Sequence, residues 1–302
     1  MGKSREIKGR IKAVGNIRRI TRTMQMIATS KFARAQQAAV SSKPYTEGLF
    51  DLVGKLGSAA EGLDHPLLAS GDGADSGGGK PELTLVLTSN RGLCGPYNGN
   101  VLKTSIHHLR GNEAARDGRV ELVGKKGLTV LKFAQVPVAR FHEQFGDTPN
   151  YDAVEQLAGE YIDAFTSGEV SAVRVVYMRY ISAGRQVPEV LQLLPFSADN
   201  LGAGDEAAAD DSSSRVEATP EFSPEPEALL DELLPAAVKA VLFQAFNDAI
   251  VSEHVARMVA MKAATDNAAK MGKALKRKFN RARQAQITTE LNEIVSGAAA
   301  LG

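Results

Sequence analysis

Tryptophan is absent from this sequence, cysteine occurs once, at Cys94, and no run of 18 apolar residues is present. One cysteine cannot form a disulfide within the chain, so the sequence fits a reducing compartment. The missing apolar run predicts no membrane-spanning helix, and the basic N-terminus lacks the apolar core of a signal peptide. Apolar residues still make up 43% of the chain, which is enough for a globular core.

Proline is missing from one end of the chain, because the last one is Pro235. Residues 236–302 are rich in Ala, Lys, Arg, Met and Leu, which are good helix formers. A continuous helix over this range is roughly 100 Å long, at about 1.5 Å per residue. A compact domain of this chain length is much smaller, so we expect the helix to project and to lie against another element.

The N-terminal region supplies a partner for that helix. Residues 4–56 are predicted to be helical, with a local bend at Pro44. Their apolar stripe consists of Ile7, Ile11, Val14, Ile17, Ile20, Met24 and Ile27. The C-terminal stripe, near a seven-residue repeat, consists of Val251, Val255, Met258, Thr265, Ala268, Gly272, Leu275, Phe279 and Ala282. Neither helix can bury its stripe alone, so we expect a long antiparallel coiled coil in which the N- and C-terminal helices pair.

Between these helices, strand-like and helix-like segments alternate. Buried-strand patterns occur at 83–88, 120–123, 136–141, 173–180 and 190–194, and helical patterns at 101–117, 127–134 and 152–166. The alternation predicts a central Rossmann-like α/β domain, with its sheet covered by helices in the doubly wound style. Pro235 is expected to mark a kink or a break between two helices.

The predicted fold is therefore an α/β domain plus a long antiparallel coiled coil. Its parts are an N-terminal coiled-coil helix at 1–69, a Gly-rich linker at 70–81, the Rossmann-like α/β domain at 82–196, an acidic flexible loop at 197–226 and a C-terminal coiled-coil helix at 227–302.

Charge is segregated along the chain, although the net charge is only +1. Residues 1–34 hold ten Lys or Arg and one acid, residues 254–283 hold nine and one, and residues 199–232 hold eleven acids and one Arg. The basic helices permit three interpretations: a solvated exterior, a nucleic-acid surface, or a shaft inside an acidic protein partner. Only Phe32 and Phe279 are aromatic in these stretches, so a platform for stacking bases is lacking.

The sequence shows no catalytic or cofactor motif. The glycine-rich segment 88–100 follows a strand but has neither the phosphate-loop nor the dinucleotide-binding spacing. It contains no histidine that could activate Cys94, which we expect to be a small buried residue. The five histidines show no metal-ligand spacing. We expect no cofactor, no metal and no catalytic residue; a nucleotide-binding enzyme stays open as an alternative, although glycine in a strand-to-helix turn needs no ligand.

Four segments resemble the gamma subunit of F-type ATP synthases. Its N-terminus is similar to residues 1–32, MGKSREIKGRIKAVGNIRRITRTMQMIATSKF. Its C-terminal signature is similar to residues 256–268, ARMVAMKAATDNA, and 282–301, ARQAQITTELNEIVSGAAAL. The first strand and turn of its α/β domain resemble residues 87–100, LTSNRGLCGPYNGN. The resemblance therefore covers both ends and the middle of the chain.

This resemblance implies a non-catalytic central shaft, which couples rotation of a membrane c-ring to conformational cycling of catalytic beta subunits. The implied partners are the alpha and beta subunits of a hexameric ring, the epsilon subunit and the c-ring, with no nucleic acid and no membrane span. The implied location is the cytoplasmic face of a bacterial plasma membrane. A basic coiled-coil protein that binds nucleic acid is the alternative.

The resemblance also implies contact residues. Met24 and Arg257 match positions that face the acidic lever loops of beta. A second set, which matches hydrogen-bonding positions at a catch loop of beta, comprises Arg283, Gln284, Thr288 and Glu290. An apolar tip, implied to lie in an apolar sleeve at the crown of the ring, comprises Ile287, Leu291, Ile294, Val295 and Ala298. Ordinary coiled-coil core is the other interpretation of the tip.

Three departures from the family pattern matter, one of which is the glycine-rich linker at 70–81. The plant chloroplast type has a regulatory cysteine pair, and the single Cys94 predicts no thiol switch here. The acidic stretch 197–219 is longer than in common bacterial relatives. Its Ala-rich composition favours a bacterium of high genomic GC, such as an actinobacterium.

Overall fold

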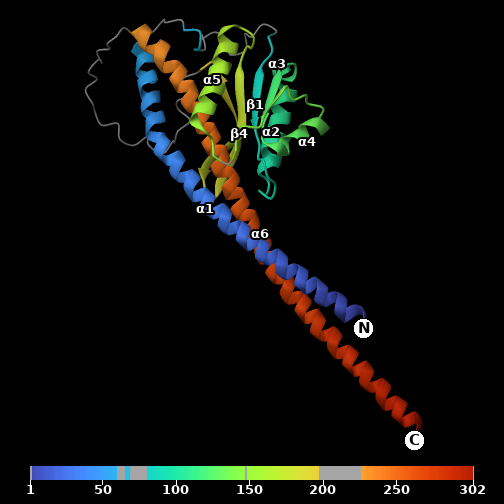
Figure 1. Ribbon diagram of the computed structural model, residues 1–302. Coiled ribbons are helices and arrows are strands. Elements are labelled where there is room, and N and C mark those ends of the chain that lie inside the picture. Colours follow the sequence, from blue (N-terminus) through green and yellow to red (C-terminus); the bar gives the residue numbers. More distant parts are fainter. Residues whose placement is uncertain (1, 60–64, 69–79, 147, 197–225, 302) are drawn as a thin grey trace. The chain divides into compact units, whose positions relative to one another are not determined.

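Figure 1 shows the computed structural model, which describes residues 2–59, 65–68, 80–146, 148–196 and 226–301. The chain forms two compact units, Met1–Lys31 with Val255–Gly302, and Phe32–His254. Two long helices contribute residues to both units: α1 spans Gly2–Ala59 and α6 spans Pro226–Leu301. Most of the predicted linker 70–81 and acidic loop 197–226 falls outside the described residues.

The strands of the second unit form one sheet in the order β3-β2-β1-β4-β5. They span Leu83–Leu87 (β1), Arg119–Val123 (β2), Arg140–His142 (β3), Val173–Ser182 (β4) and Arg185–Leu194 (β5). The first four are parallel, whereas β5 pairs antiparallel with β4. The doubly wound prediction thus fails for the last strand, because the two residues between β4 and β5 are too few for a crossover.

Helices cover both faces of this sheet. They are α2 (Tyr97–Gly111), the short α3 (Glu113–Arg116), α4 (Lys125–Phe133) and α5 (Tyr151–Thr166). The connections β1–β2 and β2–β3 step one way along the sheet and β3–β4 steps back. Right-handed crossovers therefore place α2 and α4 on one face and α5 on the other, as Figure 1 shows.

The first part of α6 joins α5 on its face of the sheet. Lys239 Nζ donates a 2.9 Å hydrogen bond to Glu155, and the rings of Phe243 and Tyr151 meet edge to face at 5.2 Å. The core under these two helices consists of buried side chains from strands, α5 and α6, including Leu85, Val175, Leu157, Tyr161, Leu234 and Leu242. The predicted break at Pro235 does not occur, because Pro235 lies inside the continuous helix α6. Burial of its neighbours in this core outweighs the roughly 3 kcal/mol cost of an interior proline.

Two further local predictions need correction. Of the predicted strand 136–141, only Arg140–Phe141 belongs to β3. Pro137 has no N–H to donate, and Gln135 has a φ of 60°, so the chain turns here instead of extending. The predicted helix 101–117 is interrupted at Asn112, whose side chain accepts a 3.0 Å hydrogen bond from Ala114 N and caps α3.

Candidate functional site

The first unit pairs the start of α1 with the end of α6 in opposite directions. The hydroxyl oxygens of Thr21 and Thr265 lie 2.8 Å apart, and a Cβ added to Gly272 would lie 3.9 Å from Val14 Cγ1. A move of seven residues along α1, from Thr21 back to Val14, therefore matches a move of seven residues along α6, from Thr265 forward to Gly272. Continued, this register puts the described start of α1 opposite Gln284. By this register, the last residues of α6 extend beyond the described α1 residues of this unit.

The facing side of α6 follows a regular pattern of burial. Buried or half-buried residues recur in steps of three and four at Val255, Met258, Met261, Thr265, Ala268, Gly272, Leu275, Phe279 and Ala282. The predicted stripe is confirmed at these positions and gains Met261, while Val251 is buried in the second unit. These steps average about 3.4 residues, close to the 3.5-residue spacing at which paired helices keep one face toward each other.

The predicted stripe on α1 is half-buried at Ile7, Ile11, Val14 and Met24 and exposed at its other three positions. Ile17, Ile20 and Ile27 are each more than half exposed, at 52–56%. The facing positions are instead Thr21, which is half-buried, and Ala28, which is buried. Steps of three between apolar residues drift away from a seven-residue repeat, and small side chains take the facing positions because they let the helices approach closely.

The two predicted lever residues lie on opposite helices of this unit. Met24 and Arg257 are both half-buried. By the register above, Met24 lies opposite Lys262, five residues along α6 from Arg257. The structure thus places these side chains about one and a half helical turns apart, on the same stretch of the unit.

The predicted catch residues share the surface of α6. Arg283, Gln284, Thr288 and Glu290 are all exposed. The Thr288 hydroxyl donates a 3.0 Å hydrogen bond to the Gln284 carbonyl oxygen, and Glu290 accepts one of 2.9 Å from Gln286 Nε2. Most of their side-chain polar groups are therefore directed to solvent and can bind another molecule.

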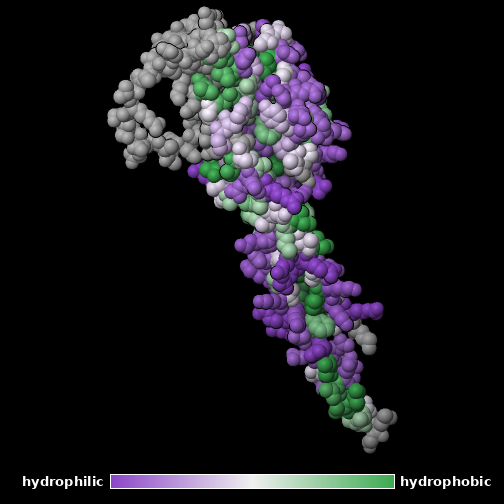
Figure 2. Space-filling model, turned by 60° about the vertical axis from the view of Figure 1, so that its left-hand side comes forward, coloured by the Kyte–Doolittle hydropathy of each residue, from purple (hydrophilic) through white to green (hydrophobic). Residues whose placement is uncertain are grey.

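The predicted apolar tip is exposed as well. Its members Ile287, Leu291, Ile294, Val295 and Ala298 lie at or beyond the end of the α1 register, and the four large ones are 48–69% exposed. Figure 2 shows hydrophobic surface near this end of α6. Burying one such side chain fully is worth about 1.5–3 kcal/mol. In the described part of this unit the tip is therefore not coiled-coil core but an apolar surface that gains free energy when covered.

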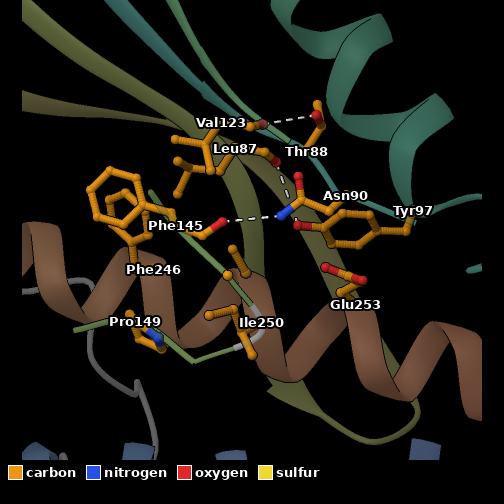
Figure 3. A pocket seen from close by; sticks show the side chains of 12 residues that line it. Leu87, Thr88, Asn90, Tyr97, Val123, Phe145, Pro149, Phe246, Ile250 and Glu253 are labelled. Atoms are coloured by element: carbon orange, nitrogen blue, oxygen red, sulfur yellow. Dashed lines mark hydrogen bonds between the residues drawn. The ribbon is translucent and has the colours of Figure 1, made fainter. Parts of the chain in front are cut away.

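The second unit offers one conventional place for a ligand, the carboxyl end of β1. Figure 3 shows Phe246 and Ile250 of α6 lying against this edge, where α/β proteins commonly bind nucleotides. The remaining cavity has a volume of about 30 Å³, with Asn90 and Glu253 in its lining. That is room for about one water molecule, whereas ligand sites span about 300–1,000 Å³. The structure therefore contradicts a nucleotide site here.

The glycine-rich segment is instead a tightly bonded turn. Asn98 Nδ2 donates to Ser89 Oγ at 2.7 Å, and Asn90 Nδ2 donates to the Phe145 carbonyl at 3.0 Å. Cys94 is buried beside Asn98, with 3.2 Å between Sγ and Nδ2, which confirms the prediction of a small buried residue. Within the described ranges, no group of three His, Cys, Asp or Glu side chains could hold a metal ion. Among the helices of those ranges, none has the length and apolar character needed to cross a bilayer.

Comparison with known proteins places the chain in a family. The family described as ATP synthase matches residues 3–301. The ATP synthase gamma chain of Rhodopirellula baltica is 39% identical over 303 residues, which cover 100% of this chain and 99% of the relative. That of Nocardia farcinica is 36% identical over 323 residues, which cover 100% and 98%.

A solved structure supports the same fold. A chain of the Euglena gracilis mitochondrial ATP synthase, from the OSCP, F1 and c-ring part in rotational state 3, matches with a TM-score of 0.65 at 19% identity. The match covers 99% of this chain and 95% of that chain. These comparisons give no support to the nucleic-acid-binding alternative. Since the sequence relatives match along their full length, this chain belongs to the gamma chain family of the ATP synthases.

Proposed function

We propose that this chain is the central rotor shaft of a proton-translocating ATP synthase and carries no catalytic residue of its own. Rotation of the c-ring turns the shaft inside a ring of alpha and beta subunits. Shaft contacts differ among the beta conformations, so each orientation favours a different conformation and a different nucleotide affinity. Family membership and the surface of the first unit support this role.

The rotating part is an antiparallel coiled coil of the start of α1 and the end of α6. Its support is the burial pattern on α6, with steps of three and four, and the opposed register of Thr21 with Thr265. Small side chains at Ala28, Ala268 and Gly272 allow the helices to approach closely. A second helix along the first raises its resistance to bending and twisting, which torque transmission requires.

Along this shaft, Met24 and Arg257 contact the lever loops of beta. Residues 254–283 carry nine Lys or Arg and one acid, so acidic lever loops are attracted to this stretch in every orientation. Further toward the end of α6, Arg283, Gln284, Thr288 and Glu290 bind the catch loop with their exposed polar groups.

The apolar tip is the observation that carries the proposal. Its exposed side chains, Ile287, Leu291, Ile294, Val295 and Ala298, occupy the part of α6 that α1 does not reach. An apolar sleeve at the crown of the ring covers them without directional bonds, as a rotating contact requires. The proposed partners are the alpha and beta subunits, the epsilon subunit and the c-ring, at the cytoplasmic face of the bacterial plasma membrane.

Single substitutions at the tip test the proposal. The chain is co-assembled with the alpha and beta subunits of its own organism, and ATP-driven rotation is followed in single complexes. Ile294→Asp places a carboxylate in the apolar sleeve and should reduce assembly or rotation at least tenfold. Asn292→Asp adds the same charge two residues away at an exposed polar position and should change little.

A wild-type chain that fails to co-assemble with alpha and beta, or to rotate with ATP, refutes the proposed function. Equal effects of the two aspartates would refute the apolar contact at the tip. A third variant, Met24→Lys, adds a cation near the lever loops and should lower the ratio of ATP made to protons moved. Unchanged coupling would contradict the lever contact.

A further inference from the structure

Two side chains of α6 are hydrogen-bonded to the part of β4 that β1 does not reach. Strand β1 pairs with β4 only as far as Val176. Beyond that point, the Met178 carbonyl accepts a 3.1 Å hydrogen bond from Ser252 Oγ. The backbone N–H of Tyr180 donates to the carboxylate of Asp248. The helix thus supplies hydrogen bonds that a neighbouring strand supplies elsewhere in the sheet.

The spacing of these two bonds suits a helix that lies along a strand. Met178 and Tyr180 are two residues apart, so their backbone groups point to the same edge of β4, about 6.6 Å from each other. Asp248 and Ser252 are four residues apart, on one face of α6 and about 6 Å apart along its axis. Pro188, which lies opposite Met178 on β5, has no N–H to donate to it. Together, Met178, Tyr180, Asp248 and Ser252 are called the clasp.

A neighbouring amide can serve the carboxyl of the clasp in either protonation state. Gln244 Nε2 donates a 2.9 Å hydrogen bond to Asp248 Oδ1. Gln244 Oε1 is buried and meets no hydrogen-bond donor among the described residues. A half-turn of this amide presents Oε1 to Asp248, so that a protonated carboxyl finds an acceptor for its hydrogen. Asp248 can therefore take up a proton while the clasp stays closed.

Charges of both signs act on this carboxyl from the sheet. Arg179 of β4 and Glu189 of β5 lie 3.5 Å apart, from Nη1 to Oε2, and affect the carboxyl in opposite directions. From α1, the uncharged ring of Phe32 packs against the ring of Tyr180, with 6.2 Å between the centroids. Burial raises the pKa of both Tyr177 and Tyr180, so these hydroxyls stay neutral between pH 5 and 8. The two opposite sheet charges leave burial to decide how the carboxyl titrates.

Burial makes the closed clasp prefer the neutral carboxyl. It raises the pKa of Asp248 to about 6, although the hydrogen bonds from Tyr180 and Gln244 favour the charged form. When the clasp opens, the carboxyl meets water and prefers its charge at neutral pH. A fall in pH through 6 therefore favours the closed clasp, and a rise in pH favours its opening.

We propose that the clasp is a proton-sensitive device, which holds α6 to β4 more firmly when Asp248 carries a proton and releases it more readily when the proton leaves. It acts on the last two turns of α6 before Val255, where the residues of the first unit begin. The proposal concerns the second unit alone and does not rest on the proposed function.

Nuclear magnetic resonance of the tyrosine amides tests the clasp in the full chain. The chain has six tyrosines, so labelling with ¹⁵N-tyrosine gives six backbone amide signals, and Tyr180→Phe identifies the one from Tyr180. This signal should shift with pH, with a midpoint near pH 6. After correction for the pH dependence of the exchange chemistry, the Tyr180 amide should exchange about tenfold more slowly at pH 5 than at pH 7.5. The factor follows because pH 5 lies about one unit below the pKa of Asp248.

Three variants separate the effect of the proton from that of packing. Asp248→Asn keeps the size and an acceptor oxygen but cannot ionise, so its Tyr180 amide should show neither the shift nor the change in exchange. Asp163→Asn, at an exposed carboxyl of α5, is the matched control and should keep both. Ser252→Ala should speed exchange of the Tyr180 amide at both pH values and leave the midpoint unchanged. A Tyr180 signal with no midpoint between pH 5 and 7, or a midpoint that persists in D248N, would overturn the proposal.

Discussion

Replacing Glu121 with alanine should destabilise the α/β unit by about 4 kcal/mol. Glu121 lies on β2 and is fully buried. Its Oε2 accepts hydrogen bonds from Tyr161 Oη at 2.9 Å and from His142 Nε2 at 2.6 Å, while Arg119 lies 2.5 Å from Oε1. Alanine leaves the Tyr161 and His142 donors unpaired inside the core, at about 1–3 kcal/mol each. Arg119 is partly exposed and can turn to water, so its loss adds little.

Protonation of Glu121 gives this prediction a pH dependence. Burial raises the pKa of the carboxyl, but hydrogen bonds from His142 and Tyr161 and the charge of Arg119 outweigh burial and leave the pKa lowered. The folded state therefore prefers the charged form. This stabilisation is complete above the ordinary carboxyl pKa and is lost as pH falls through the lower pKa of the folded state. The Glu121→Gln variant has no carboxylate to protonate, so its free energy of unfolding should fall less steeply as the pH is lowered.

Urea unfolding measures these differences. The chain has no tryptophan, so far-UV circular dichroism and amide hydrogen exchange in β2 are suitable signals. Tyr161→Phe removes one donor and should cost less than half as much as Glu121→Ala. Arg119→Ala should cost at most about 1 kcal/mol. If Glu121→Ala cost no more than Arg119→Ala, the assignment of the free energy to the buried donors would be wrong.

Three further predictions concern other parts of the chain. Burial raises the pKa of Asp248 to about 6, so the folded state gains stability as pH falls from 7 toward 4; Asp248→Asn should abolish this gain in urea unfolding. Gly272→Ala should stabilise the helical unit by about 1 kcal/mol in thermal unfolding, because the added methyl makes ordinary contact with Val14, and a lower melting temperature would contradict the helix register. Leu291→Ser should weaken binding to an isolated alpha–beta ring about tenfold, measured by co-sedimentation, whereas Thr289→Ser should not.

Much of the α/β unit could be predicted because its strands are buried on both faces. Leu83–Leu87 is an uninterrupted apolar-rich run, and such runs are read without knowledge of their neighbours. Strand β5 was harder, since Pro188 lies within it and its residues are mostly half-buried. It tolerates a proline because it is an edge strand, and edge position is decided by the sheet and not by the segment.

The candidate site could also be predicted only in part from the sequence. The facing positions on α6 follow from spacing, because apolar and small residues there keep a seven-residue repeat. On α1 the apolar residues Ile17, Ile20 and Ile27 indicated the wrong face, since the true facing positions hold Thr21 and Ala28. Sequence spacing cannot tell which of two adjacent stripes meets the partner helix. The exposure of Leu93 and Phe133 also depends on tertiary packing that no local pattern reports.

The layer that α6 forms over the sheet has a consequence for biosynthesis. Side chains such as Leu234, Leu242 and Phe246 complete the core of strands that end at Leu194. At about 5–20 residues per second, roughly three to ten seconds of translation separate the synthesis of Leu194 from that of Phe246. During that interval the chain is still attached to the ribosome, and one apolar face of the sheet is not yet covered by α6. The nascent chain is therefore expected to depend on a chaperone until residues near 250 have emerged.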